Sequence, residues 1–192
     1  MSYQTITPPS DEPVTLAQAK AQCRVDSAEE DDFIESLIQP ARELAEHRTG
    51  RALMTQTLEW AIPDLAGDKI PFPVSPVQSI ESIKYIDSNG VEQTLSPSVY
   101  ALDKTGQGKH YLRLKNGQSW PSANTQFDAV KVTFVAGYGD AAAVPAAIKQ
   151  WILMAVSFFY KHRETASDES VVTELPATFC DGLLQTVKIW GL

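Results

Sequence analysis

The chain has 192 residues and carries 24 acidic against 16 basic side chains, which gives a formal net charge of −8. Such a surface repels nucleic acid over most of its area, and no run of neighbouring basic residues is longer than Lys161-His162-Arg163. The length favours one domain with room for a subdomain. The opening residues lack a basic start and an apolar run, so we expect no signal peptide.

The N-terminal part predicts a flexible lead and a short helix. Residues 1–13 contain three prolines and few apolar groups, so we expect no regular structure there. Thr15, with Gln18 three residues later, matches a capping box. This pattern predicts a short helix over residues 16–23.

A second, longer helix is predicted over residues 28–49. Ser27 and Glu30 repeat the capping-box pattern at its start, and Gly50 ends it. Pro40 lies inside the helix and removes a backbone hydrogen bond, so we expect a kink or a break there. The apolar residues recur at helical spacing, which predicts one buried face. They are Phe33, Ile34, Leu37, Ile38, Ala41, Leu44 and Ala45.

From about residue 54 the pattern changes from helical to alternating, and it predicts strands. Apolar residues alternate around Trp60, which indicates a half-buried strand. Asn89-Gly90 predicts a hairpin with a two-residue turn. Because the strands follow one another through short turns, we expect an antiparallel sheet inserted between helices, in an α+β fold. The strands expected after the first span residues 79–87, 91–95, 99–102, 110–115 and 130–136.

Residues 145–164 predict a helix that is apolar on all sides. Between Trp151 and Tyr160 only Ser157 is polar, so this helix must be buried or must cross a membrane. A membrane span needs about 20 apolar residues and this core has roughly half of that, so we exclude a membrane. A single subunit of this size covers such a helix less easily than two subunits do. The pattern therefore favours an assembly.

The C-terminal part predicts a polar linker followed by an arm. A polar stretch follows Glu164, and the segment after Pro176 carries apolar residues at the spacing of a short amphipathic helix or a docking tail. The whole chain, residues 1–192, is then a single domain. Its parts are a helical core (14–52 and 145–165), an inserted β subdomain (54–140) and a linker with a C-terminal arm (166–192).

No catalytic constellation, cofactor motif or metal-ligand cluster is visible. His47, His110 and His162 fall in three different predicted elements, and the spacing of Cys23 and Cys180 favours reduced thiols over a disulfide. We therefore expect no enzyme activity, no cofactor and no bound metal.

One acidic run leaves alternatives open. It is typical of a solvated helix start, because carboxylates suit the positive end of the helix dipole. The same carboxylates in a divalent-metal nuclease, or as a negative surface that keeps passing DNA from binding, are the other interpretations. The run consists of Asp26, Glu29, Glu30, Asp31, Asp32 and Glu35.

Four segments, in this order and spacing, resemble the bacteriophage head–tail connector (adaptor) family, in its longer branch with an inserted β subdomain. They are VTLAQAKAQCRV, LIQPARELAEHRTGRALMTQTLEW, IPFPVSPVQSIESIKYIDSNG and VTFVAGYGDAAAVPAAIKQWILMAVSFFYKHRE, and the resemblance extends over roughly residues 13–165. Pro40 departs from the alanine-like residue expected in the family's helix.

The resemblance implies a structural, non-enzymatic virion protein. It implies a ring, usually of twelve subunits, that lies under the portal in the neck of the particle, with the host cytoplasm as the place of assembly. The partners would be other copies of the chain, the portal protein and a tail or head-completion protein, and DNA would pass without specific binding. A tail-completion or tail-terminator protein, a metal-dependent nuclease and a soluble α+β domain of another role are the alternatives.

Two sets of residues are predicted to carry these contacts. For subunit packing they are Trp151, Ile152, Met154, Phe158, Phe159, Phe33 and Leu37. For a portal-docking arm they are Phe179, Leu183, Leu184, Val187 and Trp190.

Overall fold

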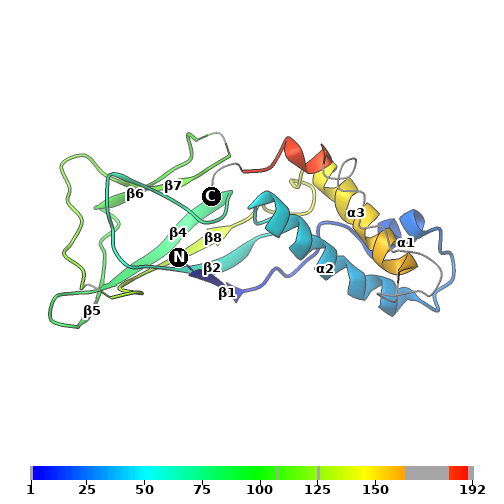
Figure 1. The fold of residues 1–192 in the computed structure, drawn as a ribbon, viewed down its shortest axis with the longest axis horizontal. Helices are drawn as coiled ribbons and strands as arrows, with labels where there is room; N and C mark the ends of the chain where they lie inside the picture. Colours follow the sequence, from blue (N-terminus) through cyan, green and yellow to red (C-terminus); the bar gives the residue numbers. More distant parts are fainter. Residues whose placement is uncertain (1, 107, 125, 163–181, 190–192) are drawn as a thin grey trace. The chain divides into compact units, whose positions relative to one another are not determined.

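The computed structural model describes residues 2–106, 108–124, 126–162 and 182–189. The chain forms two compact units (Figure 1). The β unit comprises residues 1–10 and 55–138, and the helical unit comprises residues 11–54 and 139–190. The sheets are antiparallel, so the predicted α+β fold class is confirmed.

The larger sheet of the β unit has five strands in the order β1-β2-β8-β4-β5, and every neighbouring pair is antiparallel. Strands β2 and β8 are buried at every second residue, as the alternating pattern predicts. The strands are β1 (Ser2–Thr7), β2 (Gln56–Ile62), β4 (Val77–Ile86), β5 (Glu92–Thr94) and β8 (Val130–Ala136).

The expectation of a flexible lead was wrong for β1. Its residues pair with β2, with Tyr3 opposite Trp60 and Gln4 opposite Glu59. Tyrosine, threonine and isoleucine suit a strand, and β2 supplies the backbone partners that a local reading of the sequence does not show. The prolines come only after the strand, at residues 8, 9 and 13.

A smaller sheet of three strands, in the order β3-β7-β6, completes the β unit. Phe72, just after β3, joins the two sheets: its ring centroid lies 5.6 Å from that of Trp60 and 4.9 Å from that of Phe134. All three side chains are almost fully buried and form the centre of this core. The strands are β3 (Lys69–Pro71), β6 (Tyr100–Asp103) and β7 (Tyr111–Leu114).

Strands β4 and β5 form the predicted hairpin, but its turn is longer than two residues. The N–H of Asp87 donates to the carbonyl of Val91 at 2.9 Å, and the N–H of Gly90 donates to the carbonyl of Asp87 at 3.0 Å. Three residues therefore form the loop, and Gly90 takes the positive φ of 80°. The Asp87 carboxylate favours this longer loop because it accepts the N–H groups of Asn89 and Val91.

The helical unit contains three main helices, α1 (Leu16–Cys23), α2 (Asp31–Thr49) and α3 (Ala146–Lys161). The capping box of Thr15 and Gln18 is present. The second predicted capping box is not: α2 begins three residues later than expected, and its N-cap residue Glu30 makes no capping hydrogen bond. The helix also continues through Pro40, so of the kink or break expected there the break does not occur.

No helix in the described parts of the chain is long and apolar enough to cross a membrane. Near the C-terminus, residues 182–185 form one helical turn. The segment that follows is attached to the end of α2, because the N–H of Ile189 donates to the carbonyl of Thr49 at 2.9 Å. Arg51 Nε also donates to the carbonyl of Val187.

Candidate subunit interface

Helix α3 has a fully buried stripe and a half-exposed flank. The buried side chains are spaced three and four residues apart, as on one face of a helix. They pack against α1 and α2 of the same chain, which lie beside α3 in Figure 1. The stripe consists of Ile148, Trp151, Ile152, Ala155 and Val156.

Two of the predicted subunit-packing residues belong to this buried stripe, so the prediction is corrected for them. Trp151 is 1% exposed and Ile152 is 0% exposed, so no neighbouring subunit can reach them. Arg48 of α2 covers the Trp151 ring, with its guanidinium carbon 5.2 Å from the ring centroid. These two side chains stabilise the helical unit itself, because α1 and α2 supply enough apolar surface to cover this face.

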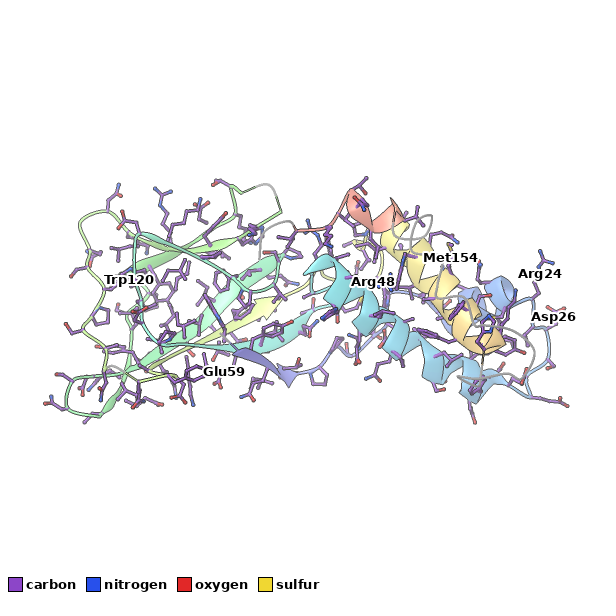
Figure 2. The ribbon with its side chains drawn as sticks, viewed as in Figure 1. Arg24, Asp26, Arg48, Glu59, Trp120 and Met154 are labelled. Atoms are coloured by element: carbon purple, nitrogen blue, oxygen red, sulfur yellow. The ribbon has the colours of Figure 1, made fainter. Side chains whose placement is uncertain are left out.

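The other five predicted packing residues are half-buried. Phe158 stacks on His162, with ring centroids 4.5 Å apart, and Met154 lies one turn before it on α3 (Figure 2). The ring centroid of Phe33 in α2 lies 6.2 Å from that of Tyr160 in α3. The set is Phe33, Leu37, Met154, Phe158 and Phe159. Their contact with another subunit stays a prediction.

A buried charge network holds the start of the helical unit against α2. Arg42 is 5% exposed, and it donates to Glu12 from Nε and to Glu46 from a terminal nitrogen, both at 2.8 Å. Burial would lower the pKa of Arg42, but the hydrogen bond to Glu12 and the nearby carboxylates raise it overall. Glu46 also accepts the N–H of Leu53 at 2.8 Å, so the network connects both ends of the segment 11–54.

The acidic run behaves as a helix start. Asp31 forms an ion pair with Lys20 of α1 at 2.5 Å, and Glu30 accepts the hydroxyl of Tyr160 from α3. Within the described residues, no group of three or more His, Cys, Asp or Glu side chains could hold a metal ion. The carboxylates therefore tie α1, α2 and α3 together, which is a structural use of the acidic run.

The cysteine and histidine side chains that could carry chemistry make contacts within the fold. Cys23 lies at the end of α1, where burial raises the pKa of its thiol, while Ser157 and Lys161 act in the opposite direction. His110 contacts the backbone of Val77 through Nδ1, at 2.9 Å from the nitrogen and 3.1 Å from the oxygen. Cys180 lies outside the described residues.

The predicted docking arm is only partly described. Phe179 and Trp190 lie outside the described residues. Leu184 is 3% exposed and packs inside the helical unit, so it is not on the surface in this structure. Leu183 and Val187 are half-buried, and their role in docking stays a prediction.

Sequence reasoning missed the most exposed apolar side chains of the described residues, which all lie in the β unit. Two of them, Tyr3 and Phe127, line a hollow of about 350 Å³ on the larger sheet, together with Lys131 and the carboxylates Glu59 and Asp128. In the sequence, the signal for Phe127 was a single aromatic residue in the polar segment NTQFDA. The four side chains are Tyr3, Ile6, Val91 and Phe127.

Comparison with solved structures shows that the fold has close relatives. A chain in the virion of a native gene transfer agent (GTA) particle is similar with a TM-score of 0.79 and 20% identity, over 100% of this chain and 97% of that one. A chain in the neck of an empty GTA particle, computed with C6 symmetry, gives 0.78 and 19% over the same shares. A chain in the neck of a native GTA particle, computed with C12 symmetry, gives 0.75 and 20%, again over 100% and 97%. At this identity the likeness establishes the fold. No curated relative matches the sequence.

A family model matches the first part of the chain. It describes the Phage gp6-like head-tail connector protein and covers residues 13–104, from the start of the helical unit through β6. This match confirms the resemblance seen in the sequence. Residues 13–104 of the chain are similar to the Phage gp6-like head-tail connector family.

Proposed function

We propose that this chain is a structural head–tail connector of a tailed bacteriophage or phage-like particle, located in the neck of the virion. The observation that carries the proposal is the match to the connector family over residues 13–104. The fold that the chain shares over its full length with chains of the virion and of the neck of GTA particles supports it. The chain would act through protein–protein contacts, without catalysis.

We further propose that the subunits form a ring under the portal that extends the DNA channel and joins the capsid to the tail. Related neck structures were computed with C6 and C12 symmetry, which supports a cyclic arrangement and is compatible with twelve subunits. The half-exposed flank of α3 is a candidate contact within such a ring. The portal protein and a tail or head-completion protein are the proposed partners.

The charge distribution fits DNA that passes without binding. The helical unit carries sixteen acidic and nine basic residues, whereas the β unit carries eight and seven. An acidic surface repels phosphate, so DNA would slide past it without specific contacts.

Electron microscopy of particles that contain a labelled chain tests the location. We expect label at a single vertex, in the neck. Label distributed over the whole capsid, or absent from the neck, would overturn the proposal. A pull-down with portal protein and with tail-tube protein separates a connector from a tail-completion or tail-terminator protein, because a connector binds the portal.

A nuclease using the acidic run is the alternative from another class. Asp31→Ala with Asp32→Ala separates the two functions. A connector keeps its place in the particle after this change, whereas a metal-dependent nuclease activity would be lost.

A further inference from the structure

The three-stranded sheet and its turns gather basic residues that are far apart in the sequence. The segments 68–71 and 97–115 form this sheet, and they hold five of the seven basic residues of the β unit but only two of its eight acidic residues. No basic run in the sequence marks them, because side chains that share one face of a strand are two residues apart. The bases are Lys69, Lys104, Lys109, Arg113 and Lys115, and the acids are Asp68 and Asp103.

Strand β7 has one apolar face and one basic face. Leu112 is fully buried, so Tyr111 and Arg113 on either side of it belong to the opposite, outer face. Lys115 follows Arg113 at the same spacing, in the sequence KHYLRLK. Successive side chains on this face are about 7 Å apart, since each strand residue rises by about 3.4 Å. This distance is close to the spacing of neighbouring phosphates along a nucleic-acid strand.

The neighbouring strand β3 widens this outer face. Lys69 is opposite Arg113, and its Nζ lies 3.9 Å from the centroid of the Tyr111 ring in a cation–π contact. Strand β6 lies on the other side of β7 (Figure 1) and places Asp103 opposite Tyr111. Lys69, Tyr111, Arg113 and Lys115 are called the basic face below.

Acids neutralise the basic face only in part. Lys69 and Arg113 share one carboxylate, because Asp103 Oδ2 lies 3.4 Å from Lys69 Nζ and 3.6 Å from Arg113 Nη1. The Asp103 side chain is 6% exposed, against 44% for Lys69 and 57% for Arg113, so the cations and not the acid face the solvent. Lys115 donates to a neutral backbone carbonyl at 2.8 Å and keeps its full charge. With the exposed Asp68 included, five bases against two acids leave these segments with a formal charge of +3.

The basic face suits a polyanion better than the surface of another protein. A protein interface has a largely apolar centre, whereas contacts with phosphates need cations and no apolar side chain. The exposed large apolar side chains of the described residues are Tyr3, Ile6, Val91 and Phe127, and none of them lies in the three-stranded sheet. A connector around a DNA channel meets one regular polyanion, which is the DNA itself.

We propose that the basic face contacts the phosphates of the DNA that passes through the connector, with Lys69, Arg113 and Lys115 as the contacting cations. This inference deepens the proposed connector function and rests on it. The contact reads no base, so the DNA can still slide, while the acidic helical unit repels the same phosphates. The three-stranded sheet is then the part of the β unit that faces the channel.

Photo-crosslinking in DNA-filled particles tests this contact. Tyr111→p-azidophenylalanine keeps an aromatic ring in the basic face and removes no cation. After illumination and nuclease digestion, we expect mass spectrometry to find nucleotide adducts on the peptide that contains residue 111. Tyr3→p-azidophenylalanine is the matched control, because Tyr3 is 50% exposed on the larger sheet, and it should give none.

Three results of this experiment would overturn the inference. They are adducts of residue 111 with a protein chain instead of DNA, no adducts at all, and equal adduct yields at residues 3 and 111. The first of them would assign the basic face to an acidic protein surface. Localisation of the unmodified labelled chain is read separately. If the chain lies at the neck vertex without DNA adducts, the inference fails and the proposed function stands, whereas absence from the neck removes the proposed function.

An NMR titration of the full-length chain with a short DNA duplex at low salt gives an independent measurement. We expect amide shift changes concentrated in β3 and β7. Arg113→Gln with Lys115→Gln should weaken binding by about tenfold or more, because two phosphate contacts are lost. Lys84→Gln with Lys131→Gln removes the same charge from the larger sheet and should change binding by less than about twofold.

Circular dichroism shows whether these variants fold. Equal weakening by the two pairs would mean that the net charge alone controls binding, and it would contradict the proposed contact. A wild-type chain without shift changes in β3 and β7 would contradict it as well.

Discussion

Arg42 is a buried cation that joins two carboxylates of the helical unit. Its guanidinium joins Glu12 and Glu46, both at 2.8 Å, and it is buried while the two carboxylates are partly exposed. Arg42→Ala would remove the buried guanidinium that pairs with both carboxylates, so we expect a loss of about 2–4 kcal/mol in the free energy of unfolding. Urea denaturation followed by tryptophan fluorescence measures it.

A matched control lies one turn earlier on the same helix. Gln39 donates to Glu43 at 2.9 Å on the exposed side of α2. Gln39→Ala should cost less than about 0.5 kcal/mol, since exposed polar pairs contribute little. Equal losses for the two variants would show that Arg42 does not act through its buried charges.

Asp103 makes the β unit sensitive to acid. Two hydrogen bonds from Thr105, one from its hydroxyl and one from its N–H, together with Lys69, lower the pKa of Asp103 to about 2. The stability that this carboxylate contributes is therefore present above its ordinary pKa of 3.8 and is lost as the pH falls toward 2. We expect the wild type to be more stable than Asp103→Asn by a constant amount between about pH 5 and 8.

The difference in the free energy of unfolding between the wild type and Asp103→Asn should become smaller as the pH falls from about 4 to 2. At the lower pH the side chain at position 103 is uncharged in both proteins. Denaturation at a series of pH values measures it. Asp87, whose pKa is also lowered by backbone hydrogen bonds, is unchanged in both proteins, so its contribution cancels. A difference that stays constant down to pH 2 would contradict the assignment to Asp103.

At the scale of elements, α3 has a buried stripe and a half-exposed flank, and substitutions can test the two faces separately. Trp151→Ala should cost about 3–5 kcal/mol in the free energy of unfolding, because it leaves a cavity in the core. Met154→Lys and Phe158→Lys affect the half-exposed flank, so they should cost about 1 kcal/mol or less but reduce incorporation into particles.

Gln150→Lys is the control, since Gln150 is exposed on the same helix. Gln150→Lys should change neither the free energy of unfolding nor the incorporation into particles. If Met154→Lys and Phe158→Lys leave incorporation unchanged while the protein stays folded, the flank is not a subunit contact.

Pro40 gives a second prediction at this scale. It lies in α2, is exposed and cannot donate a backbone hydrogen bond to Ser36. Because the helix is continuous through this position, Pro40→Ala restores a backbone N–H that can donate to the carbonyl of Ser36. We therefore expect the free energy of unfolding to rise by about 1 kcal/mol or more, as measured by thermal or chemical denaturation. Pro145→Ala, at the N-cap of α3 where no such donor is needed, should give no comparable gain. A loss in Pro40→Ala would mean that the proline is required for the packing of α2.

At the scale of the whole molecule, the C-terminal segment connects stability to the proposed docking. Removal of the chain after residue 170 would also remove buried Leu184 and the hydrogen bond from Ile189 to Thr49. Such a truncation should therefore destabilise the helical unit as well as affect binding. Leu183→Asp with Val187→Asp is a sharper test, because both side chains are only half-buried.

If the arm docks on the portal, this double variant should fold and lose portal binding in a pull-down. Leu184→Ala, in contrast, should lower the free energy of unfolding by about 2–5 kcal/mol, as buried leucines do. Normal portal binding by a folded Leu183→Asp, Val187→Asp chain would exclude the arm as the docking element.

Local patterns in the sequence predicted the order of the main elements and carried the connector resemblance. Helical spacing, the capping box at Thr15 and the alternation around Trp60 are local signals, and each depends only on neighbouring residues. The tertiary structure decided whatever depends on a distant partner. It showed that β1 pairs with β2, that Trp151 and Ile152 are enclosed by α1 and α2, and that Phe127 lies beside Tyr3 at a hollow. The physical reason is that burial and strand pairing are properties of contacts between segments far apart in the chain, which local composition and periodicity do not contain.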